Sequence, residues 1–418
     1  MIILRTVKNI SSLNIAASVL LFLAAILAAV VANSSLSPVY QDFLLQELHL
    51  RIGNFNLFSH GGHPLKMIEF INDCLMTVFF LAVGLEIKRE LLVGELSSVR
   101  KAALPFIAAC GGMVVPVVIY ALSVASGTPE TRGMAIPMAT DIAFSLGVLS
   151  LLGKRVPLSL KIFLTAFAVV DDIGGILVIA LFYSADVAYG YLIAAAVLYV
   201  FLYYMGKFGV TQKIFFLFFG VIIWYLFLQS GIHSTISGVI LAFVIPARPR
   251  LDAGKYIERI RDIIGEFPVS KSDNIVLTNA QIATLKQVER ASDYVISPLQ
   301  SLEDNLHGAV SFVILPLFAF ANAGVVFSGS GSIVGDVSIA VAAGLLLGKF
   351  LGIYLFTWLA VKSGVALMPA GMNWKNIAGV SLLGGIGFTV SLFIANLSFA
   401  DEYPELLNQA KFGVLVGT

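Results

Sequence analysis

Two adjacent carboxylates, Asp171 and Asp172, lie in the middle of an apolar segment that runs from Leu158 to Tyr183. Ionisable groups inside a membrane are costly and usually mark function. Burial and mutual repulsion both disfavour a second negative charge, so we expect at least one of the two to exchange a proton near neutral pH. Deprotonated carboxylates are hard oxygen ligands for a small alkali cation, and protonation releases that cation. The pair therefore predicts one site that holds either a proton or a cation, as exchange across a membrane requires.

Other ionisable side chains also fall within apolar segments. Lys349, in "GLLLGKFLG", could pair with one of the two aspartates and hold it ionised until something displaces the lysine. Asp141 and Glu86 belong to the same group of candidates. Asp73, in "FINDCLMTVFF", fits a hydrogen-bonded structural role as well as a functional one.

Two segments carry residues that interrupt a helix in mid-membrane. In residues 133–147, Pro137 removes a backbone donor shortly before Asp141. Residues 379–393 contain three central glycines, Gly384, Gly385 and Gly387. Such interruptions in two halves of a chain point to a transporter site between inverted repeats, although close helix packing also explains glycines. If both helices break, Asp141 could neutralise the two positive helix ends and Lys349 the two negative ends.

The composition indicates a polytopic helical membrane protein. The 418 residues are 58% hydrophobic and 12% charged, against about 25% charged residues in soluble domains. Apolar runs of roughly 20 residues, enough to span a bilayer as a helix, recur along the chain. We expect spans near residues 13–33, 68–87, 102–125, 133–152, 158–183, 188–206, 213–230, 232–247, 306–327, 335–361 and 376–399, and a twelfth helix from about Gln409. The last segment is too short to cross a bilayer, so we expect a stub or a truncated span.

The basic residues predict the orientation of the chain. With the N-terminus in the cytoplasm, most of the 26 Lys and Arg residues fall on the cytoplasmic side. We expect residues 1–418 to form a single transmembrane domain with two long loops. The external loop 34–67 contains "LHLRIGNFNLF", whose alternation around "GN" predicts a β-hairpin. The charged loop 248–304 would be cytoplasmic, and flexible or partly helical.

Several long motifs resemble those of the NhaA sodium/proton antiporters. They are "ATDIAFSLGVLSLLGKRVPLSLKIFLTAFAVVDDIGG", "FFLAVGLEIKREL", "ILPLFAFANAGV", "LLLGKFLG" and "GGIGFTVSLFIA". The resemblance covers most of the chain from Met67 to Gly413. It implies about twelve transmembrane helices in inverted repeats, with the fourth and eleventh interrupted and crossing in mid-membrane. It also implies pH-regulated export of Na+, and of Li+, in exchange for protons by alternating access.

The resemblance assigns roles to individual residues. Asp171 and Asp172 would form the cation and proton site, with Asp172 the more direct Na+ ligand. Asp171 would pair with Lys349 in the inactive or proton-loaded state, and Thr140 and Asp141 would help to line the site. The positions tied to pH sensing are Glu86, Lys88, Arg89, Glu90, His233, Glu303 and His307. Asp304 stands where better-known members of the family have a second histidine.

The resemblance also implies a location and a partner. It places the protein in the bacterial inner membrane as a multi-pass protein, with the N-terminus in the cytoplasm. A second copy of the chain would bind through the external hairpin near residues 49–58. No cofactor is expected besides the transported Na+, Li+ and H+, and no nucleic-acid partner.

Two other classes of protein share some of these features. An intramembrane aspartyl protease needs aspartates on two facing helices and a GxGD motif, but Phe388 follows "GGIG" here. A cation channel would need rings of carbonyl or acidic groups, and the sequence shows none. Cys74 and Cys110 both fall in apolar spans, where we expect packing rather than a disulfide or a metal site. The antiporter remains the favoured interpretation.

Overall fold

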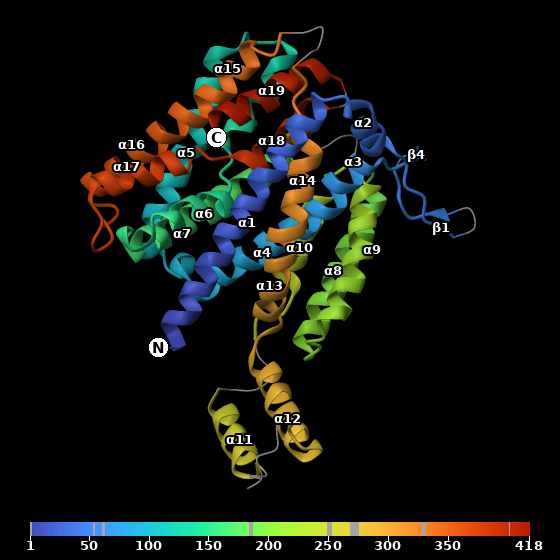
Figure 1. Ribbon diagram of the computed structural model, residues 1–418, viewed down its shortest axis with the longest axis vertical. Coiled ribbons are helices and arrows are strands. Elements are labelled where there is room, and N and C mark those ends of the chain that lie inside the picture. The colour runs from blue at the N-terminus through green and yellow to red at the C-terminus, as the bar shows by residue number, and fades with distance from the viewer. Residues whose placement is uncertain are drawn as a thin grey trace.

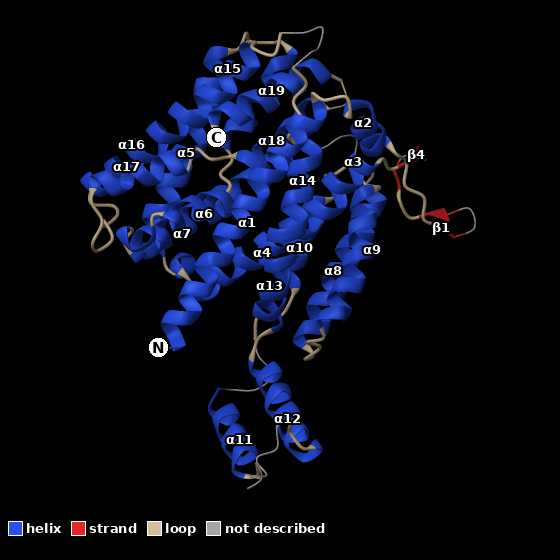
Figure 2. Cartoon of the chain, viewed as in Figure 1, coloured by secondary structure: helices blue, strands red, loops and turns tan. Residues whose placement is uncertain are grey.

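The computed structural model describes residues 2–52, 55–60, 63–183, 187–248, 253–267, 276–327, 332–400 and 402–418. Most of this described chain is helical, and its strands form only two short hairpins (Figure 2). Seven of its helices or continuous helix series are long and apolar enough to cross a membrane. They are α1 (Ile2–Ala32), α3–η1–α4 (Met67–Phe70, Ile71–Leu75, Met76–Val93), α5 (Val99–Ser123), α7 (Leu158–Phe182), α8 (Tyr189–Lys207), α13–η5–α14 (Pro298–Ala309, Val310–Ile314, Leu315–Asn322) and α15–η6–α16 (Asp336–Ala343, Gly344–Gly348, Lys349–Lys362).

Two further spans are interrupted. The first consists of η3 (Pro129–Met138) and α6 (Ile142–Leu151), and the second of α17 (Trp374–Leu383) and α18 (Phe388–Phe399). Each pair bends by 43° at its break. The first break follows Pro137, which cannot donate a helical hydrogen bond. The predicted interruption of both spans is confirmed.

Three further helices are shorter. Two are apolar, α9 (Lys213–Leu228) and α10 (Thr235–Val244), and the third is α19 (Pro404–Gly417). The expected start of the last helix near Gln409 is wrong, because α19 begins with Pro404 at its first turn. Proline suits this position, since its fixed φ is helical and its missing donor would be unpaired anyway. Hydropathy alone does not predict the start of α19, because its first turns are polar. With these helices, the described chain matches the expected all-α polytopic architecture.

One face of the molecule, which we call the hairpin side, carries α2 (Ser37–Leu45) and the strands (Figure 1). Strands β1 (Arg51–Ile52) and β2 (Phe55–Asn56) pair antiparallel, with Arg51 opposite Asn56. This hairpin confirms the prediction, although its turn, residues 53–54, lies outside the described residues. A second hairpin, β3 (Ser59–His60) with β4 (His63–Pro64), and helix α2 were not predicted.

The opposite face, which we call the loop side, carries α11 (Ala253–Gly265) and α12 (Asn279–Val295). These two helices lie side by side below the bundle (Figure 1). The charged stretch 248–304 is therefore partly helical, as expected, and α13 begins within it at Pro298. The described chain also contains two single 3₁₀ turns, η2 (Glu95–Ser97) and η4 (Gly153–Arg155).

The outer surface of the bundle is apolar. Helix α8, for example, exposes Ile193, Val197 and Val200 along its length. Contiguous exposed apolar surface of this kind marks a membrane or protein contact. The helix lengths and this surface together define a multi-pass membrane protein.

Candidate functional site

The two interrupted spans cross at their breaks and complete each other's hydrogen bonding. Asp141 N donates to Ile386 O at 2.6 Å. Thr140 Oγ1 donates to Gly384 O at 2.9 Å, and Ser391 Oγ donates to Ile136 O at 2.8 Å. Irregular backbone at membrane depth is tolerated only when other protein groups satisfy it. The crossing therefore supplies partners for backbone groups that the breaks release.

Asp141 lies at the start of two helices. Its Oδ1 accepts a hydrogen bond from Phe144 N at 3.0 Å and thereby caps α6. Its Oδ2 accepts from Thr389 Oγ1 at 2.6 Å and from Thr389 N at 3.2 Å, in the first turn of α18. A carboxylate is favourable at the positive end of a helix dipole. This buried side chain is thus placed to compensate both positive ends, the arrangement proposed from the sequence.

The glycines of the second break allow the backbone of η6 and of the first break to approach closely. A Cβ at Gly385 would lie 2.5 Å from Leu345 O, and one at Gly387 would lie 2.8 Å from Ala139 O. Both distances are below ordinary van der Waals contact, and both involve backbone atoms. Close packing is therefore part of the reason for glycine here, in addition to the interruption of the helix.

Lys349 is fully buried and joins the first break to the aspartate pair. Its Nζ lies 2.7 Å from Asp171 Oδ2 and donates to Thr140 Oγ1 at 2.9 Å. The ion pair proposed from the sequence is thus present in the structure. Lys349 reaches the break through the Thr140 hydroxyl, which itself donates to Gly384 O, so the predicted compensation of the negative helix ends would act through this hydroxyl and not through a direct bond to a helix-end carbonyl. Lys349 directly follows the π-helical turn η6, and such turns are frequent at functional sites.

Asp172 differs from its neighbour because it borders a cavity. The cavity has a volume of about 270 Å³ and is lined by Asp172 and Asp141 together with Thr140 and Thr389. Adjacent residues of a helix point about 100° apart, so Asp171 faces Lys349 while Asp172 faces the cavity. Of the two carboxylates, Asp172 is therefore the one that a cation in this cavity can reach.

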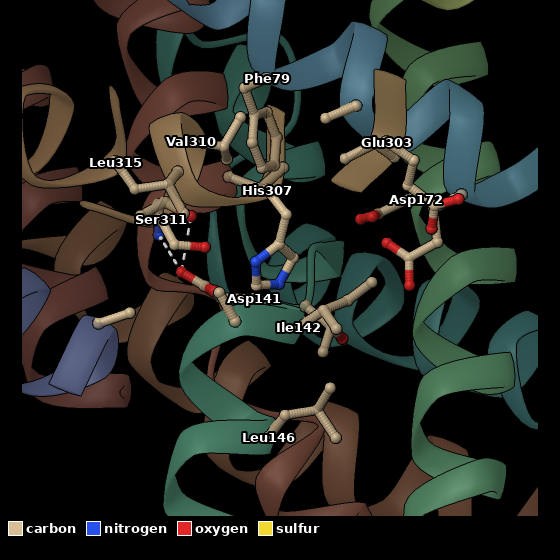
Figure 3. Close-up of a pocket in the computed structure, with 18 of the residues that line it drawn as sticks. Phe79, Asp141, Ile142, Leu146, Asp172, Glu303, His307, Val310, Ser311 and Leu315 are labelled. Carbon is tan, nitrogen blue, oxygen red and sulfur yellow. Dashed lines mark hydrogen bonds between the residues drawn. The ribbon is translucent and has the colours of Figure 1, made fainter. Parts of the chain in front are cut away.

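Charged residues line the same cavity towards the loop side. Glu86 and Arg89 come from α4, and Glu303 and His307 come from α13. Figure 3 shows the His307 ring pointing into the cavity between Asp141 and Asp172. Arg89 forms an ion pair with Glu303, with Nε 2.9 Å from Oε1. Four of the seven positions expected in pH sensing thus surround the approach to Asp172.

The other three positions do not line this cavity. Lys88 donates through Nζ to Phe243 O at 2.7 Å and to the carbonyl of Ile245, so it caps the C-terminal end of α10. Glu90 pairs with Arg89 at 3.2 Å and accepts from Glu95 N at 3.0 Å, which holds the turn after α4. Lys88 is therefore separated from the expected cluster at the end of α4, because adjacent helical residues point to different faces, whereas Glu90 remains joined to it through Arg89.

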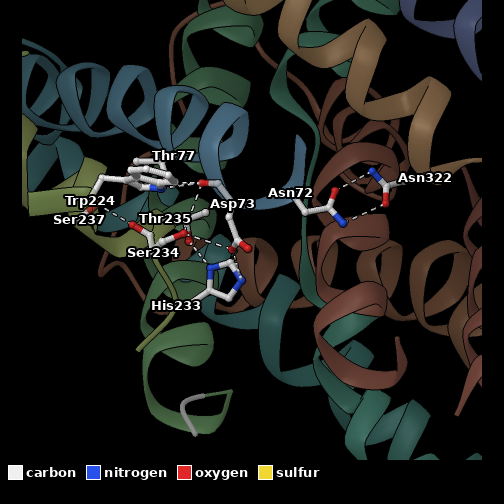
Figure 4. A network of polar contacts seen from close by, with 9 residues as sticks. All are labelled: Asn72, Asp73, Thr77, Trp224, His233, Ser234, Thr235, Ser237 and Asn322. Carbon is white, nitrogen blue, oxygen red and sulfur yellow. Dashed lines mark hydrogen bonds and ion pairs between the residues drawn. The ribbon is translucent and has the colours of Figure 1, made fainter. Parts of the chain in front are cut away.

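His233 lies on the other side of the molecule, beside Asp73. Its Nε2 is 3.5 Å from Asp73 Oδ1, and Ser234 Oγ donates to the same oxygen at 3.2 Å (Figure 4). Both residues line a second cavity of about 640 Å³ that also contacts β3 and β4 through His60 and His63. The sequence left the role of Asp73 open and did not pair it with His233, because the two residues are 160 positions apart, with Asp73 in η1 and His233 in the turn before α10.

Three buried or partly buried asparagines, which the sequence did not predict as a group, form a hydrogen-bonded chain. Asn322 Nδ2 donates to Asn72 Oδ1 at 2.8 Å, and Asn396 Nδ2 donates to Asn322 Oδ1 at 2.9 Å. Each falls inside an apolar run, in "FINDC", "FAFANAG" and "FIANL". A polar amide in such a run is itself a signal, since it must find hydrogen-bond partners inside the bundle.

The fold and the site together define the class of protein. Two interrupted helices cross in mid-membrane beside a buried carboxylate pair and a buried lysine, and cavities approach this region from both faces. Broken helices around a midplane site are typical of secondary transporters. The structure is thus that of an ion-coupled membrane transporter.

The chain belongs to the family described as Na+/H+ antiporter 1, which it matches over residues 8–418. It is 75% identical over 418 residues to the Na(+)/H(+) antiporter NhaA of Bacteroides thetaiotaomicron, a match that covers the whole chain and 95% of that protein. It is also 75% identical over 418 residues to the NhaA antiporter of Bacteroides fragilis, with 96% of that protein covered. The NhaA antiporter of Parabacteroides distasonis is 51% identical over 425 residues, covering the whole chain and 94% of that protein. The family resemblance seen in the sequence is confirmed, and the protein is a transporter and not an enzyme.

Proposed function

We propose that this protein exchanges Na+, and also Li+, for protons, with both kinds of ion competing for the Asp171–Asp172 pair. The observation that carries the proposal is the different environment of the two carboxylates. Asp172 borders the loop-side cavity, whereas Asp171 is buried against Lys349. The names of the similar proteins support Na+ and H+ as the exchanged ions.

The geometry supports different roles for Asp171 and Asp172 in binding the cation. A cation that enters the cavity meets the Asp172 carboxylate first, with the Thr140 and Asp141 side chains on the same wall. A positive charge beside Asp172 repels the Lys349 ammonium, and Asp171 is then free to complete the cation's oxygen ligands. Protonation of the carboxylates reverses these steps and releases the cation. One pair thus alternates between a cation-loaded and a proton-loaded state.

Transport further requires that the pair open to each face in turn, which is alternating access between the loop side and the hairpin side. We assign the loop side to the cytoplasm of a bacterium and the membrane to its inner membrane, because basic residues concentrate in the loops on that side of the predicted topology. The N-terminus is then cytoplasmic. We also propose that two copies associate through the hairpin β1–β2, which extends away from the bundle in Figure 1.

Competition predicts how the apparent affinity for sodium changes with pH. In liposomes that contain the purified protein, the Na+ concentration for half-maximal proton flux should rise as pH falls. The expected change is about tenfold per pH unit for each competing proton, below the apparent pKa of the coupled pair. K+ should not substitute for Na+. A half-maximal Na+ concentration that is constant across the pH series would exclude competition, and passive Na+ flux without proton movement would indicate a channel.

A separate pH sensor at the cavity entrance is a second, additive proposal. Glu86, Arg89, Glu303 and His307 line the entrance, where their charges would change the local cation concentration. The same flux series in a protein with Glu90→Gln, which removes a partner of Arg89, and His307→Ala distinguishes the two ideas. A sensor predicts that the profile moves along the pH axis with its maximal rate preserved. Superimposable profiles would exclude the sensor and leave competition as the sole source of pH dependence.

A further inference from the structure

The two cavities approach each other along α18 but do not share lining residues. Thr389 and Val390, in the first turn of α18, line the loop-side cavity that contains Asp172. Phe393 and Asn396, one and two turns further on, line the hairpin-side cavity. The short stretch of protein between these positions therefore separates Asp172 from the hairpin side.

Three phenylalanines fill this stretch. Phe80 comes from α4, Phe318 from α14 and Phe393 from α18, and all three are buried. The ring centroids of Phe393 lie 5.6 Å from Phe80 and 6.3 Å from Phe318. The ring of His233 packs edge-on against the same Phe393 ring at 5.1 Å. Packed rings of this kind exclude a hydrated cation, because nothing in the layer can replace its water ligands.

Three asparagines form a second layer on the hairpin side of the rings. Asn72 comes from η1, Asn322 from α14 and Asn396 from α18, so the same three helix series contribute to both layers. Asn72 and Asn322 donate to each other, at 3.3 Å and 2.8 Å, and Figure 4 shows this reciprocal pair. Asn396 is joined to the pair by one amide hydrogen bond, from its Nδ2 to Asn322 Oδ1, at 2.9 Å. We call the six residues the Phe–Asn seal.

The three helix series of the seal are joined by unequal numbers of hydrogen bonds. Two reciprocal hydrogen bonds join α14 to η1, whereas one hydrogen bond and the Phe318–Phe393 ring contact join α18 to α14. A neutral hydrogen bond contributes little net stability, because water can replace it when the layer opens. Separation of α18 from the other two series would therefore break one hydrogen bond and the two ring contacts of Phe393.

Helix α18 is also the element that is tied to the ion site. Its first turn donates to Asp141 through Thr389, and Asp141 borders the same cavity as Asp172. A change in charge at the carboxylates therefore acts on the end of the helix that carries Phe393 and Asn396. The rigid helix transmits any shift of its first turn to the seal, about one turn away.

We propose that the Phe–Asn seal is the hairpin-side gate of the transport pathway, and that it opens by separation of α18 from η1–α4 and α14. The inference rests on the proposed exchange by alternating access, and it adds the identity of the residues that close one face. In the present structure the gate is shut and the site is open to the loop side. Opening breaks the Asn396–Asn322 bond and leaves the Asn72–Asn322 pair intact.

Paired cysteines test this order of separation. In a background with Cys74→Ser and Cys110→Ser, Asn322→Cys with Asn396→Cys is cross-linked by a short bifunctional thiosulfonate reagent, and exchange is measured in liposomes. We expect linkage to slow sodium-driven proton exchange at least about tenfold, because opening then becomes impossible, and a reducing agent to restore it. The matched control is Asn72→Cys with Asn322→Cys, whose linkage should leave most of the exchange intact. Exchange that survives linkage of the first pair, or equal inhibition by both links, would overturn the gate.

The unlinked background protein separates this outcome from failure of the proposed function. If the background lacks sodium-driven proton exchange, the proposed function is wrong; if it exchanges and the links have no effect, only the gate is wrong.

A second measurement does not depend on exchange. Val390→Cys, beneath the seal, should react with an impermeant thiol reagent from one membrane face, compared in spheroplasts and inverted vesicles. Adding Asn396→Ala should make it reactive from both faces, whereas Asn376→Ala, outside the seal, should not. Labelling from one face in all three proteins would contradict the gate.

Discussion

Asp172→Asn is expected to abolish sodium-coupled proton exchange. The amide has nearly the same shape as the carboxylate but cannot ionise, so it can neither attract the cation strongly nor carry the proton. Asp172 borders the cavity, whereas Asp171 is held by Lys349, and the neighbour therefore cannot replace it. The measurement is the dissipation of a pH gradient by added Na+ in liposomes, for which we expect no signal above protein-free liposomes.

Asp336→Asn is the matched control for this change. Asp336 is an exposed carboxylate in the first turn of α15 and lines neither of the two cavities described above. Its substitution should leave exchange near the level of the unmodified protein. If Asp172→Asn exchanged sodium at an unmodified rate, the assignment of the site would be wrong.

Lys349→Ala is expected to cause the largest loss of stability. Lys349 is completely buried and its Nζ lies 2.7 Å from Asp171 Oδ2. Removing one partner of a buried ion pair leaves the other charge uncompensated, at a cost of roughly 3–5 kcal/mol. Thr140 would lose its hydrogen bond from Nζ as well. Coupling should fall with stability, since Asp171 and the break at Thr140 both depend on this side chain.

The pH dependence of the melting temperature distinguishes loss of the charge pair from simple loss of packing. With Lys349 absent, protonation of Asp171 removes the uncompensated charge, so the deficit should shrink as pH falls. A packing defect alone would give the same deficit at every pH. Lys362→Ala is the control, because Lys362 is exposed at the end of α16 and its contact is with the face of the Trp358 ring. Melting and exchange that are both unchanged by Lys349→Ala would exclude the structural role of the pair.

The helix breaks and the Asp171–Lys349 pair could be predicted from the sequence because each depends on the properties of a few residues close together in the chain or on a single buried charge. Two adjacent aspartates in an apolar helix admit few structural explanations, and Pro137 and the glycines of the second break interrupt helices by their own backbone properties. Lys349 was the remaining buried charge of opposite sign, so its pairing with the aspartates followed from the cost of burying it alone.

Contacts between distant helices could not be predicted in the same way. Asp73 and His233 meet only because η1 packs beside the start of α10, and no local pattern states which faces of two helices touch. Lys88 looked like a member of the charged cluster because its neighbours are charged, yet its direction on α4 takes it to the end of α10. The asparagine layer was not predicted, because the prediction of buried polar residues rested on charge and amides are neutral. A buried amide nevertheless needs hydrogen-bond partners.

Proton release on cation binding tests the central claim most directly. Purified protein in a weakly buffered solution is titrated with NaCl near neutral pH, and the protons that appear in solution are counted with an indicator dye. If one carboxylate pair holds either ion, each bound Na+ should displace protons, and Asp172→Asn should release none. The yield should fall at high pH, where the pair is already deprotonated. Saturable Na+ binding without proton release at any pH would show that cation and proton occupy separate sites and would contradict the account.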